Sequence, residues 1–290
     1  DDRLVSVAVE PRTTSDRERF AEVLARMQRE DPTLRSSVDP DTGQTLLSGM
    51  GELHLEVVVG RMARDFGVDA VYGKPRVSFR ETARSAAKGM AEYRRQVAGE
   101  NLFARVEIGI EPRTDSEKSV DVVDRLRQGA LPQNYLPAIY ESIANAAEGG
   151  GLYGYPVTRV RVSLLDATFA DVGQPEIALN SATSMAFREA LRAAGSQVLE
   201  PYGRLEIRVP EDFLGGVVKT LSQRRAVVED TRFARGSVVI RGVVPIGEMF
   251  GYLTALRSQT QGRGSFSLEP LDYRPVPDNL VALHHERLYG

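Results

Sequence analysis

The sequence predicts an α+β protein of three domains, in which two βαββαβ modules flank a middle α+β domain. Its 290 residues suffice for two or three domains at roughly 100–200 residues each. Strand-like and helix-like hydrophobic patterns follow one another in the same order in residues 1–80 and 200–290. Residues 81–199 have a different order, so we expect a separate middle domain there.

The first module, residues 1–80, carries several local signals for its elements. Ser15 and Glu18 have the spacing of a capping box, which predicts that a helix begins at Ser15. Gly67 follows the second helical pattern and is typical of a residue that ends a helix. The expected elements are a strand at 4–9, a helix from 15, strands at 34–38 and 44–48 around an Asp-Pro-Asp-Thr-Gly turn, a helix at about 51–67 and a strand at 68–79.

The middle domain and the last module follow from the same patterns. In the middle domain, residues 81–199, we expect strands at 90–97, 103–110 and 157–165, a helix from 132 to about 149, and a helix that follows a loop at 166–175 and ends at Gly195. In the last module, residues 200–290, we expect strands at 204–209, 225–233, 237–244 and 265–273, with helices after Pro210 and around 249–256.

Composition excludes several classes of protein. The chain is 42% hydrophobic and 27% charged, as in ordinary globular proteins, and no apolar run reaches the roughly 20 residues that cross a membrane. Without cysteine it has no disulfide, thiol nucleophile or thiolate metal site, which favours a cytoplasmic protein. The three histidines lack H-E-x-x-H spacing, so we expect no metal site. The chain begins at Asp1 without a signal-peptide pattern, and we interpret it as part of a longer protein.

Several short motifs suggest nucleotide binding or catalysis, but the sequence around each of them does not fit that function. The Gly73-Lys74 pair precedes proline, so the chain has no phosphate-binding loop of the G-x-x-x-x-G-K-[ST] type. Residues 149–154 match G-x-G-x-x-G but lie between a helix and a strand, the reverse of a dinucleotide-binding turn. His54 has no nucleophile or metal ligand nearby, so we interpret it as a helix-surface histidine. We therefore expect no catalytic residue and no cofactor in this chain.

The charge pattern leaves two interpretations open. The net charge of −3 provides no overall basic field for nucleic acid, but only 4 of the 37 basic residues are lysine. Arginine suits contacts with RNA phosphates and bases, whereas codon bias in a GC-rich genome explains the same excess. Residues 259–264, Gln-Thr-Gln-Gly-Arg-Gly, follow a helix that carries Arg257, and they form either an anion-contacting turn or a solvated one.

Longer motifs give a family resemblance. Residues 48–56, Ser-Gly-Met-Gly-Glu-Leu-His-Leu-Glu, and residues 73–77, Gly-Lys-Pro-Arg-Val, resemble the third domain of translation elongation factor G. Further motifs resemble its other domains: 248–252 and 256–266 are similar to the fifth, and 154–157, 182–190 and 199–201 to the fourth. The resemblance covers nearly the whole chain in order.

This resemblance implies a function for the chain. Residues 1–80, 81–199 and 200–290 would be domains III, IV and V, and the middle domain would contain a left-handed βαβ crossover. The chain would be the ribosome-binding C-terminal part of a monomeric, cytoplasmic translational GTPase that promotes translocation of tRNA and mRNA. Its partners would be both ribosomal subunits with their RNA, tRNA, and in some members the ribosome recycling factor, but no membrane. GTP and magnesium would bind in an N-terminal domain that this chain lacks.

The resemblance also implies two groups of contact residues. The tip of the lever-like middle domain would contact the decoding region and tRNA through Gly99, Glu100, Asn101, Leu102, Thr168, Phe169, Ala170, Asp171 and Gly173. The last domain would contact large-subunit RNA near the sarcin–ricin loop through Arg224, Arg225, Arg257, Gln261 and Arg263.

The tip departs from the family pattern at three places. Residues 98–102 read Ala-Gly-Glu-Asn-Leu where the family usually has Gly-Gly-x-Gly-Gln. Residues 170–173 read Ala-Asp-Val-Gly where it usually has His-Asp-Val-Asp, and Asn134 stands where it often has Glu. Ordinary loop divergence or a specialised tip explains these changes. The alternatives are therefore a recycling-specialised paralogue, a tetracycline-type ribosomal protection protein, or a GTPase-free ribosome- or RNA-binding module.

Overall fold

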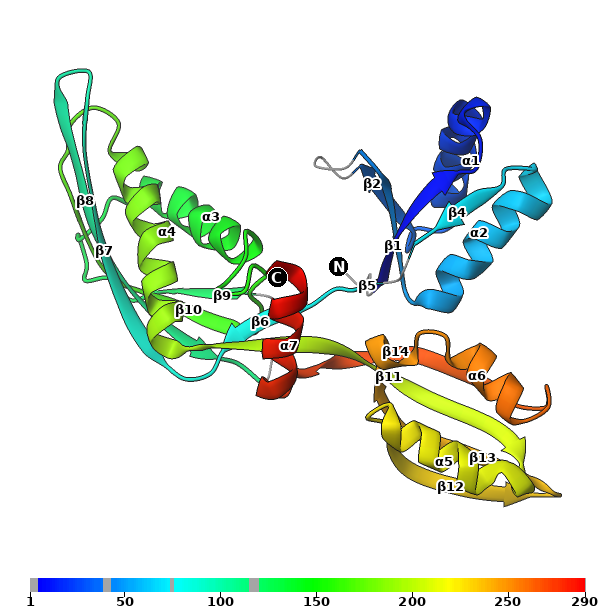
Figure 1. Ribbon diagram of the computed structural model, residues 1–290. Coiled ribbons are helices and arrows are strands. Elements are labelled where there is room, and N and C mark those ends of the chain that lie inside the picture. The colour runs from blue at the N-terminus through cyan, green and yellow to red at the C-terminus, as the bar shows by residue number, and fades with distance from the viewer. Residues whose placement is uncertain (1–4, 39–42, 74–75, 115–119, 290) are drawn as a thin grey trace. The chain divides into compact units, whose positions relative to one another are not determined.

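The chain forms two compact α+β units in a computed structural model that describes residues 5–38, 43–73, 76–114 and 120–289 (Figure 1). The first unit consists of Asp1–Ser78 with Glu200–Arg274, and the second of Phe79–Leu199 with Pro275–Gly290. Each unit therefore combines segments that are far apart in the sequence. The predicted fold class, with two βαββαβ modules and a different middle domain, is confirmed.

The first module has the predicted order of elements. They are β1 (Val5–Pro11), α1 (Arg17–Glu30), β2 (Arg35–Val38), β3 (Thr45–Gly49), α2 (Glu52–Phe66), β4 (Ala70–Tyr72) and β5 (Arg76–Val77). The antiparallel sheet has the order β2-β3-β1-β4, and β5 also pairs with β1. The buried face of α1 is the predicted one, with Phe20, Val23, Leu24 and Met27. Gly67 ends α2 with φ of 66°, as predicted.

Two local predictions in this module were wrong. The capping box at Ser15 and Glu18 does not form, and α1 begins at Arg17 without a side-chain cap. A 3₁₀ turn at Thr14–Asp16 precedes it, and the Thr13 hydroxyl donates to Asp16 Oδ2 at 2.7 Å. This local bond offers the chain an alternative to the capping box. The single strand expected at 68–79 is instead divided into β4 and β5.

The middle domain is a four-stranded sheet with helices on one face. Its elements are β6 (Arg80–Ala83), β7 (Ala87–Val97), β8 (Glu100–Pro112), β9 (Val120–Asp124), α3 (Leu136–Glu148), β10 (Val160–Phe169) and α4 (Pro175–Ala194), and α7 (Asp278–Tyr289) belongs to the same unit. The order is β7-β8-β10-β9, with β9 and β10 parallel and connected through α3. Sequence patterns missed β6, β9 and α7.

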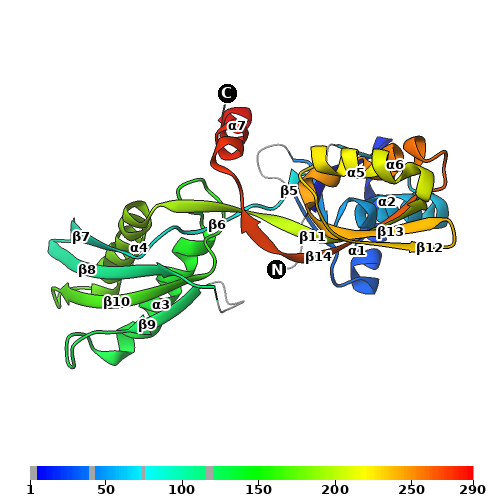
Figure 2. The same cartoon turned by 90° about the horizontal axis from the view of Figure 1, so that it is seen from below.

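Helix α4 lies alongside β7 (Figures 1 and 2), and the two backbones approach each other very closely. A Cβ on Gly89 of β7 would overlap the backbone of Ala190. The buried face of α4 contains Ala178, Ala182, Ala186 and Ala190, whose small side chains permit this approach. Gly195 ends α4, as predicted, with φ of 78°.

A buried carboxylate connects three segments of this unit. Glu81 of β6 is inaccessible to solvent, and it accepts hydrogen bonds from the backbone N–H groups of Tyr153 at 3.1 Å and Tyr155 at 2.8 Å. It also accepts one from the Ser196 hydroxyl at 2.6 Å. Gly151 lies so close that a Cβ there would collide with the carboxylate. These bonds attach β6 to the 151–155 turn and to the start of β11 (Ser196–Pro210).

The last module repeats the order of the first. After β11 it contains α5 (Leu214–Gln223), β12 (Val227–Ala234), β13 (Ser237–Pro245), α6 (Tyr252–Gln259) and β14 (Ser265–Pro275). The sheet order is β12-β13-β11-β14, which is equivalent to that of the first module. Helices α5 and α6 lie on one face of the sheet (Figure 2), over a core that includes Leu205, Ile207, Val217, Leu221, Ile240, Tyr252 and Leu256.

Candidate nucleic-acid interface

The tip of the middle domain begins with a tight hairpin between β7 and β8. Val97 pairs with Glu100, so only Ala98 and Gly99 form the turn. Both have positive φ, 51° and 85°, which is the pattern of a type I′ hairpin turn. Glu100 and Asn101 are exposed, whereas Leu102 is only 4% exposed and belongs to the core. Of the four residues predicted here, Leu102 therefore supports the turn from inside.

The second predicted tip segment lies against the first. The backbone N–H of Ala170 donates to the Phe103 carbonyl at 3.0 Å. Gly173 has φ of 58°, and a Cβ on it would collide with the Glu100 carboxylate. Thr168 and Asp171 are exposed, as is Gly173.

The third departure lies at the same end of the domain. Tyr135, next to Asn134, packs edge to face on Phe169, with 5.6 Å between the ring centroids. Phe169 is partly buried against the core. The structure thus brings together the three places at which the sequence departs from the family pattern.

The tip is acidic rather than basic. Residues 98–102 and 168–174 contain Glu100 and Asp171 but neither lysine nor arginine. Partial burial raises the pKa of the Tyr135 hydroxyl, and the nearby carboxylates of Glu176 and Asp171 raise it further. The exposed cations Arg94 and Arg95 of β7 lie beside these loops, opposite Phe103 and Leu102 across the hairpin.

The second candidate surface is the turn after α6 in the last module. The buried hydroxyl of Thr260 donates to the Leu256 carbonyl at 2.7 Å and accepts from the Gly264 N–H at 2.8 Å. The Gly262 N–H donates to the Arg257 carbonyl at 2.7 Å. Gln261 and Gly262 have positive φ, 55° and 80°. The turn between Thr260 and Gly264 is thus fixed by its own hydrogen bonds.

Three of the predicted RNA-contacting residues are exposed at this turn. Arg257, Gln261 and Arg263 are all solvent-exposed. The Arg263 guanidinium lies over the Phe213 ring, with Cζ 5.1 Å from the centroid, which orients it and leaves its N–H groups available. Such a turn can present two cations and an amide to an anionic backbone.

Arg224 and Arg225 are placed differently from these three. Both are partly buried, and their guanidinium groups are bonded to other groups of the last module. Sequence reasoning identified them as cations at the end of a helix but had no signal for their internal partners. The structure therefore separates them from the exposed surface formed by Arg257, Gln261 and Arg263.

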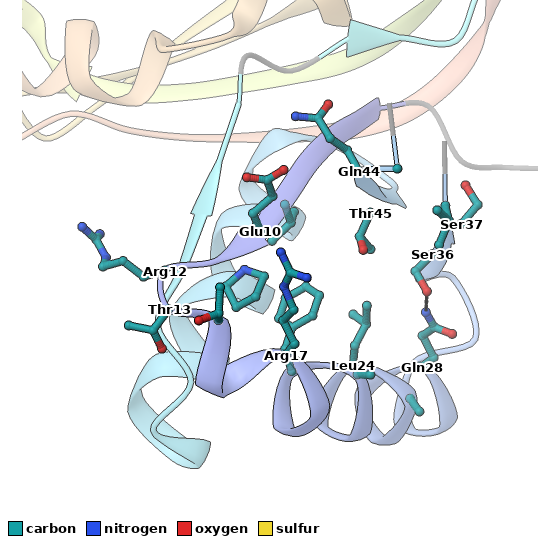
Figure 3. A pocket seen from close by; sticks show the side chains of 18 residues that line it. Glu10, Arg12, Thr13, Arg17, Leu24, Gln28, Ser36, Ser37, Gln44 and Thr45 are labelled. Atoms are coloured by element: carbon teal, nitrogen blue, oxygen red, sulfur yellow. Dashed lines mark hydrogen bonds between the residues drawn. The ribbon is translucent and has the colours of Figure 1, made fainter. Parts of the chain in front are cut away.

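His54 and the first module add no chemistry to these surfaces. His54 Nδ1 accepts from the Met50 N–H at 3.1 Å, and Nε2 contacts Asp31 Oδ2 at 2.6 Å, so its two nitrogens are used structurally. A groove of about 710 Å³ between α1 and the strands contains Arg17 and Glu10, of opposite charge (Figure 3). Gln28 bridges the groove to Ser36 at 2.5 Å.

Within the described residues, no group of three or more histidine or acidic side chains is arranged to hold a metal ion. Among those residues, no helix is long and apolar enough to span a membrane.

Three family models match consecutive parts of the chain. They are elongation factor G domain III at residues 2–74, elongation factor G domain IV at 75–195, and the elongation factor G C-terminus at 197–283. The chain belongs to the elongation factor G family. It matches the C-terminal domains of that translation factor, in the family's own order.

A solved structure supports the same assignment. The chain is 31% identical to a protein from Thermus thermophilus whose crystal structure superposes with a TM-score of 0.77. The match covers 99% of this chain and 43% of that one, so the chain spans less than half the length of the solved protein.

Proposed function

We propose that this chain is the ribosome-binding part of a translational GTPase that promotes movement of tRNA and mRNA through the ribosome. The observation that supports the proposal is the ordered match of three elongation factor G models to residues 2–283. GTP and magnesium would bind in a part of the protein outside these residues. The protein would act as a cytoplasmic monomer, with ribosomal RNA and tRNA as its partners.

In this proposal the chain acts mechanically and electrostatically. The first module would transmit the nucleotide state by a rigid-body movement, and the middle domain would place its tip in the decoding region. The turn carrying Arg257, Gln261 and Arg263 would contact phosphates of large-subunit RNA. The two residues of the middle-domain hairpin turn, Ala98 and Gly99, would be at the leading end.

The complete protein tests the proposal in a reconstituted translation system. We expect it to advance mRNA by one codon when GTP is present, as measured by toeprinting of pre-translocation ribosomes. Residues 1–290 alone are expected to show no GTP turnover, with or without ribosomes. Failure of the complete protein to move mRNA would contradict the translocase role, and turnover by 1–290 alone would contradict the assignment of the nucleotide site.

A recycling-specialised paralogue is the second candidate, because of the tip. Residues 98–102 and 168–174 contain no lysine or arginine, and the tip has lost the histidine and most of the glycines that the family usually carries there. A factor that only splits post-termination ribosomes would need these features less. Subunit splitting in the presence of the recycling factor, without support of polypeptide synthesis as the sole factor, would favour this candidate.

A further inference from the structure

Arg224 directs its donors at the backbone that precedes α6. Its Nη1 donates to the Glu248 carbonyl at 2.7 Å and to the Phe250 carbonyl at 3.2 Å. Its Cζ lies 5.0 Å from the centroid of the Tyr252 ring, over the ring face. Tyr252 is the first residue of α6 and is 1% exposed. A single guanidinium thus connects the end of α5 with the start of α6.

Arg225 forms a partly buried ion cluster beside it. Its guanidinium pairs with Glu200 of β11, and Nη1 lies 3.4 Å from Glu248 Oε1. The Arg225 side chain is 26% exposed and that of Glu200 is 8% exposed. Removing one partner of such a pair leaves a charge that is buried without compensation.

The backbone around this cluster is conformationally restricted. Arg225 has φ of 61°, in the left-handed region that non-glycine residues rarely adopt. Gly251, which precedes α6, has φ of 74°. Glycine adopts such a φ freely, whereas the strain at Arg225 persists because surrounding contacts determine its conformation, here the bonds of its guanidinium to Glu200 and Glu248. The Gly251 N–H donates to Glu52 Oε2 of α2 at 3.0 Å, so the first module also holds this segment.

The same contacts decide where the exposed turn lies. Helix α6 is short, from Tyr252 to Gln259, and leads directly into the turn that ends at Gly264. At its far end, Gln259 Oε1 accepts from the Thr220 hydroxyl of α5 at 3.3 Å. Because α6 is attached to α5 at both ends, a change at its first residue would shift Arg257 and Arg263 together.

We propose that Arg224 and Arg225 are positioning residues: they hold the 246–251 segment so that α6 presents Arg257 and Arg263 to RNA, and they contact no phosphate themselves. The proposal rests on the proposed function, because it takes the turn after α6 as the RNA-contacting surface. It differs from a direct role in the kind of side chain required. A phosphate contact tolerates lysine, whereas Arg224 places its planar guanidinium over the Tyr252 ring while Nη1 donates to both carbonyls. An ammonium group would keep the donors but lose the planar contact with the ring.

Salt dependence of binding separates the two roles. Each phosphate contact contributes roughly 0.7–0.9 to the slope of log K against log salt concentration. We would measure binding of the full chain to purified large ribosomal subunits from about 50 to 200 mM KCl, a range over which phosphate contacts change affinity strongly. The variants are Arg224→Lys, Arg224→Ala, Arg225→Lys and Arg263→Ala, each at a temperature where circular dichroism shows it folded. Arg208→Ala is the matched control, since Arg208 is exposed on β11 between the buried residues Ile207 and Val209.

We expect Arg224→Lys, Arg224→Ala and Arg225→Lys to weaken binding about five- to tenfold at about 100 mM salt with an unchanged slope. Arg263→Ala is expected to reduce the slope by about 0.7–0.9, and Arg208→Ala to change neither quantity. Normal binding by Arg224→Lys, or a reduced slope for Arg224→Ala, would overturn the positioning role. An unchanged slope for Arg263→Ala would instead count against the proposed RNA surface, so the two failures are distinguishable.

Glu248→Gln provides a test of opposite sign that removes no cation. The Glu248 side chain is 38% exposed, and its backbone carbonyl stays available to Arg224. Simple electrostatics predicts tighter binding when a negative charge is removed near RNA. Positioning predicts about threefold weaker binding, because Arg225 loses a partner. Tighter binding by Glu248→Gln would overturn the proposal.

Discussion

Replacing Glu81 by alanine is expected to destabilise the middle domain by about 3–4 kcal/mol. The substitution leaves the N–H groups of Tyr153 and Tyr155 and the Ser196 hydroxyl without their acceptor. A buried donor without a partner costs about 1–3 kcal/mol. We expect the total for the three donors to fall at the low end of the sum of their individual costs, because water can enter the space that the side chain vacates. Glu81→Gln keeps the shape of the side chain but turns an NH₂ group toward these donors, and we expect it to lower stability by about 2 kcal/mol.

Urea unfolding combined with amide hydrogen exchange measures both the global and the local effect. Exchange should accelerate at Tyr153 and Tyr155, whose amides lose their acceptor. Glu111→Ala is the matched control, because this exposed carboxylate lies 3.7 Å from Arg161, and exposed ion pairs contribute about 0–1 kcal/mol. A change below about 1 kcal/mol for Glu81→Ala, with unaltered exchange at both amides, would refute the reasoning.

Three further predictions concern burial and close packing. Burial raises the pKa of Glu200 to about 7 from an ordinary value of 4.5, so the folded state binds the proton more tightly than the unfolded state does. The free energy of unfolding should therefore fall by up to about 3 kcal/mol as pH rises from about 5 to 8. Urea titrations across that range should show a flatter dependence for Glu200→Gln, and an unchanged slope would contradict this. Gly89→Ala should lower stability by more than about 3 kcal/mol, because its Cβ would overlap the Ala190 backbone. The control Gly109→Ala, whose Cβ would lie 3.4 Å from Leu165, should lower it by under about 1 kcal/mol, and equal melting temperatures of the two variants would disprove the close approach. Tyr252→Phe removes a buried hydroxyl that lacks a hydrogen-bond partner among the described residues, so unfolding should show unchanged or slightly higher stability, and a loss above about 1 kcal/mol would reveal a partner.

Hydrophobic periodicity was sufficient for the elements that bury one continuous face. The spacing from Phe20 to Met27 placed α1 correctly, and Gly67 and Gly195 marked the ends of α2 and α4. These signals are local, because a helix face or a left-handed residue is encoded within a few positions.

Elements defined by distant partners were missed. Strand β6 exists because residues 80–83 pair with residues 196–199. A segment of four residues contains no hydrophobic pattern that predicts such a distant pairing. Strand β9, Val-Asp-Val-Val-Asp, is short and only partly buried. The roles of Arg224 and Arg225 depend on carbonyls and carboxylates more than 20 residues away in the sequence. The sequence therefore showed that both residues are charged but not which groups they bond.

Strand β11 has a practical consequence for dividing this protein. Residues 196–199 pair with β6 in one unit, while residues 202–210 pair with β13 in the other, within one uninterrupted strand. The chain also returns to the middle domain near its end, where the Val276 N–H donates to the Val198 carbonyl at 2.9 Å and Arg84 pairs with Asp278 at 2.8 Å. A middle domain cut out at residues 81 and 199 would lose β6 residue Arg80 and this returning segment. Separate expression of the middle domain therefore requires residues 275–289 to be connected to residues 79–199 by an engineered linker, because truncation alone would remove them.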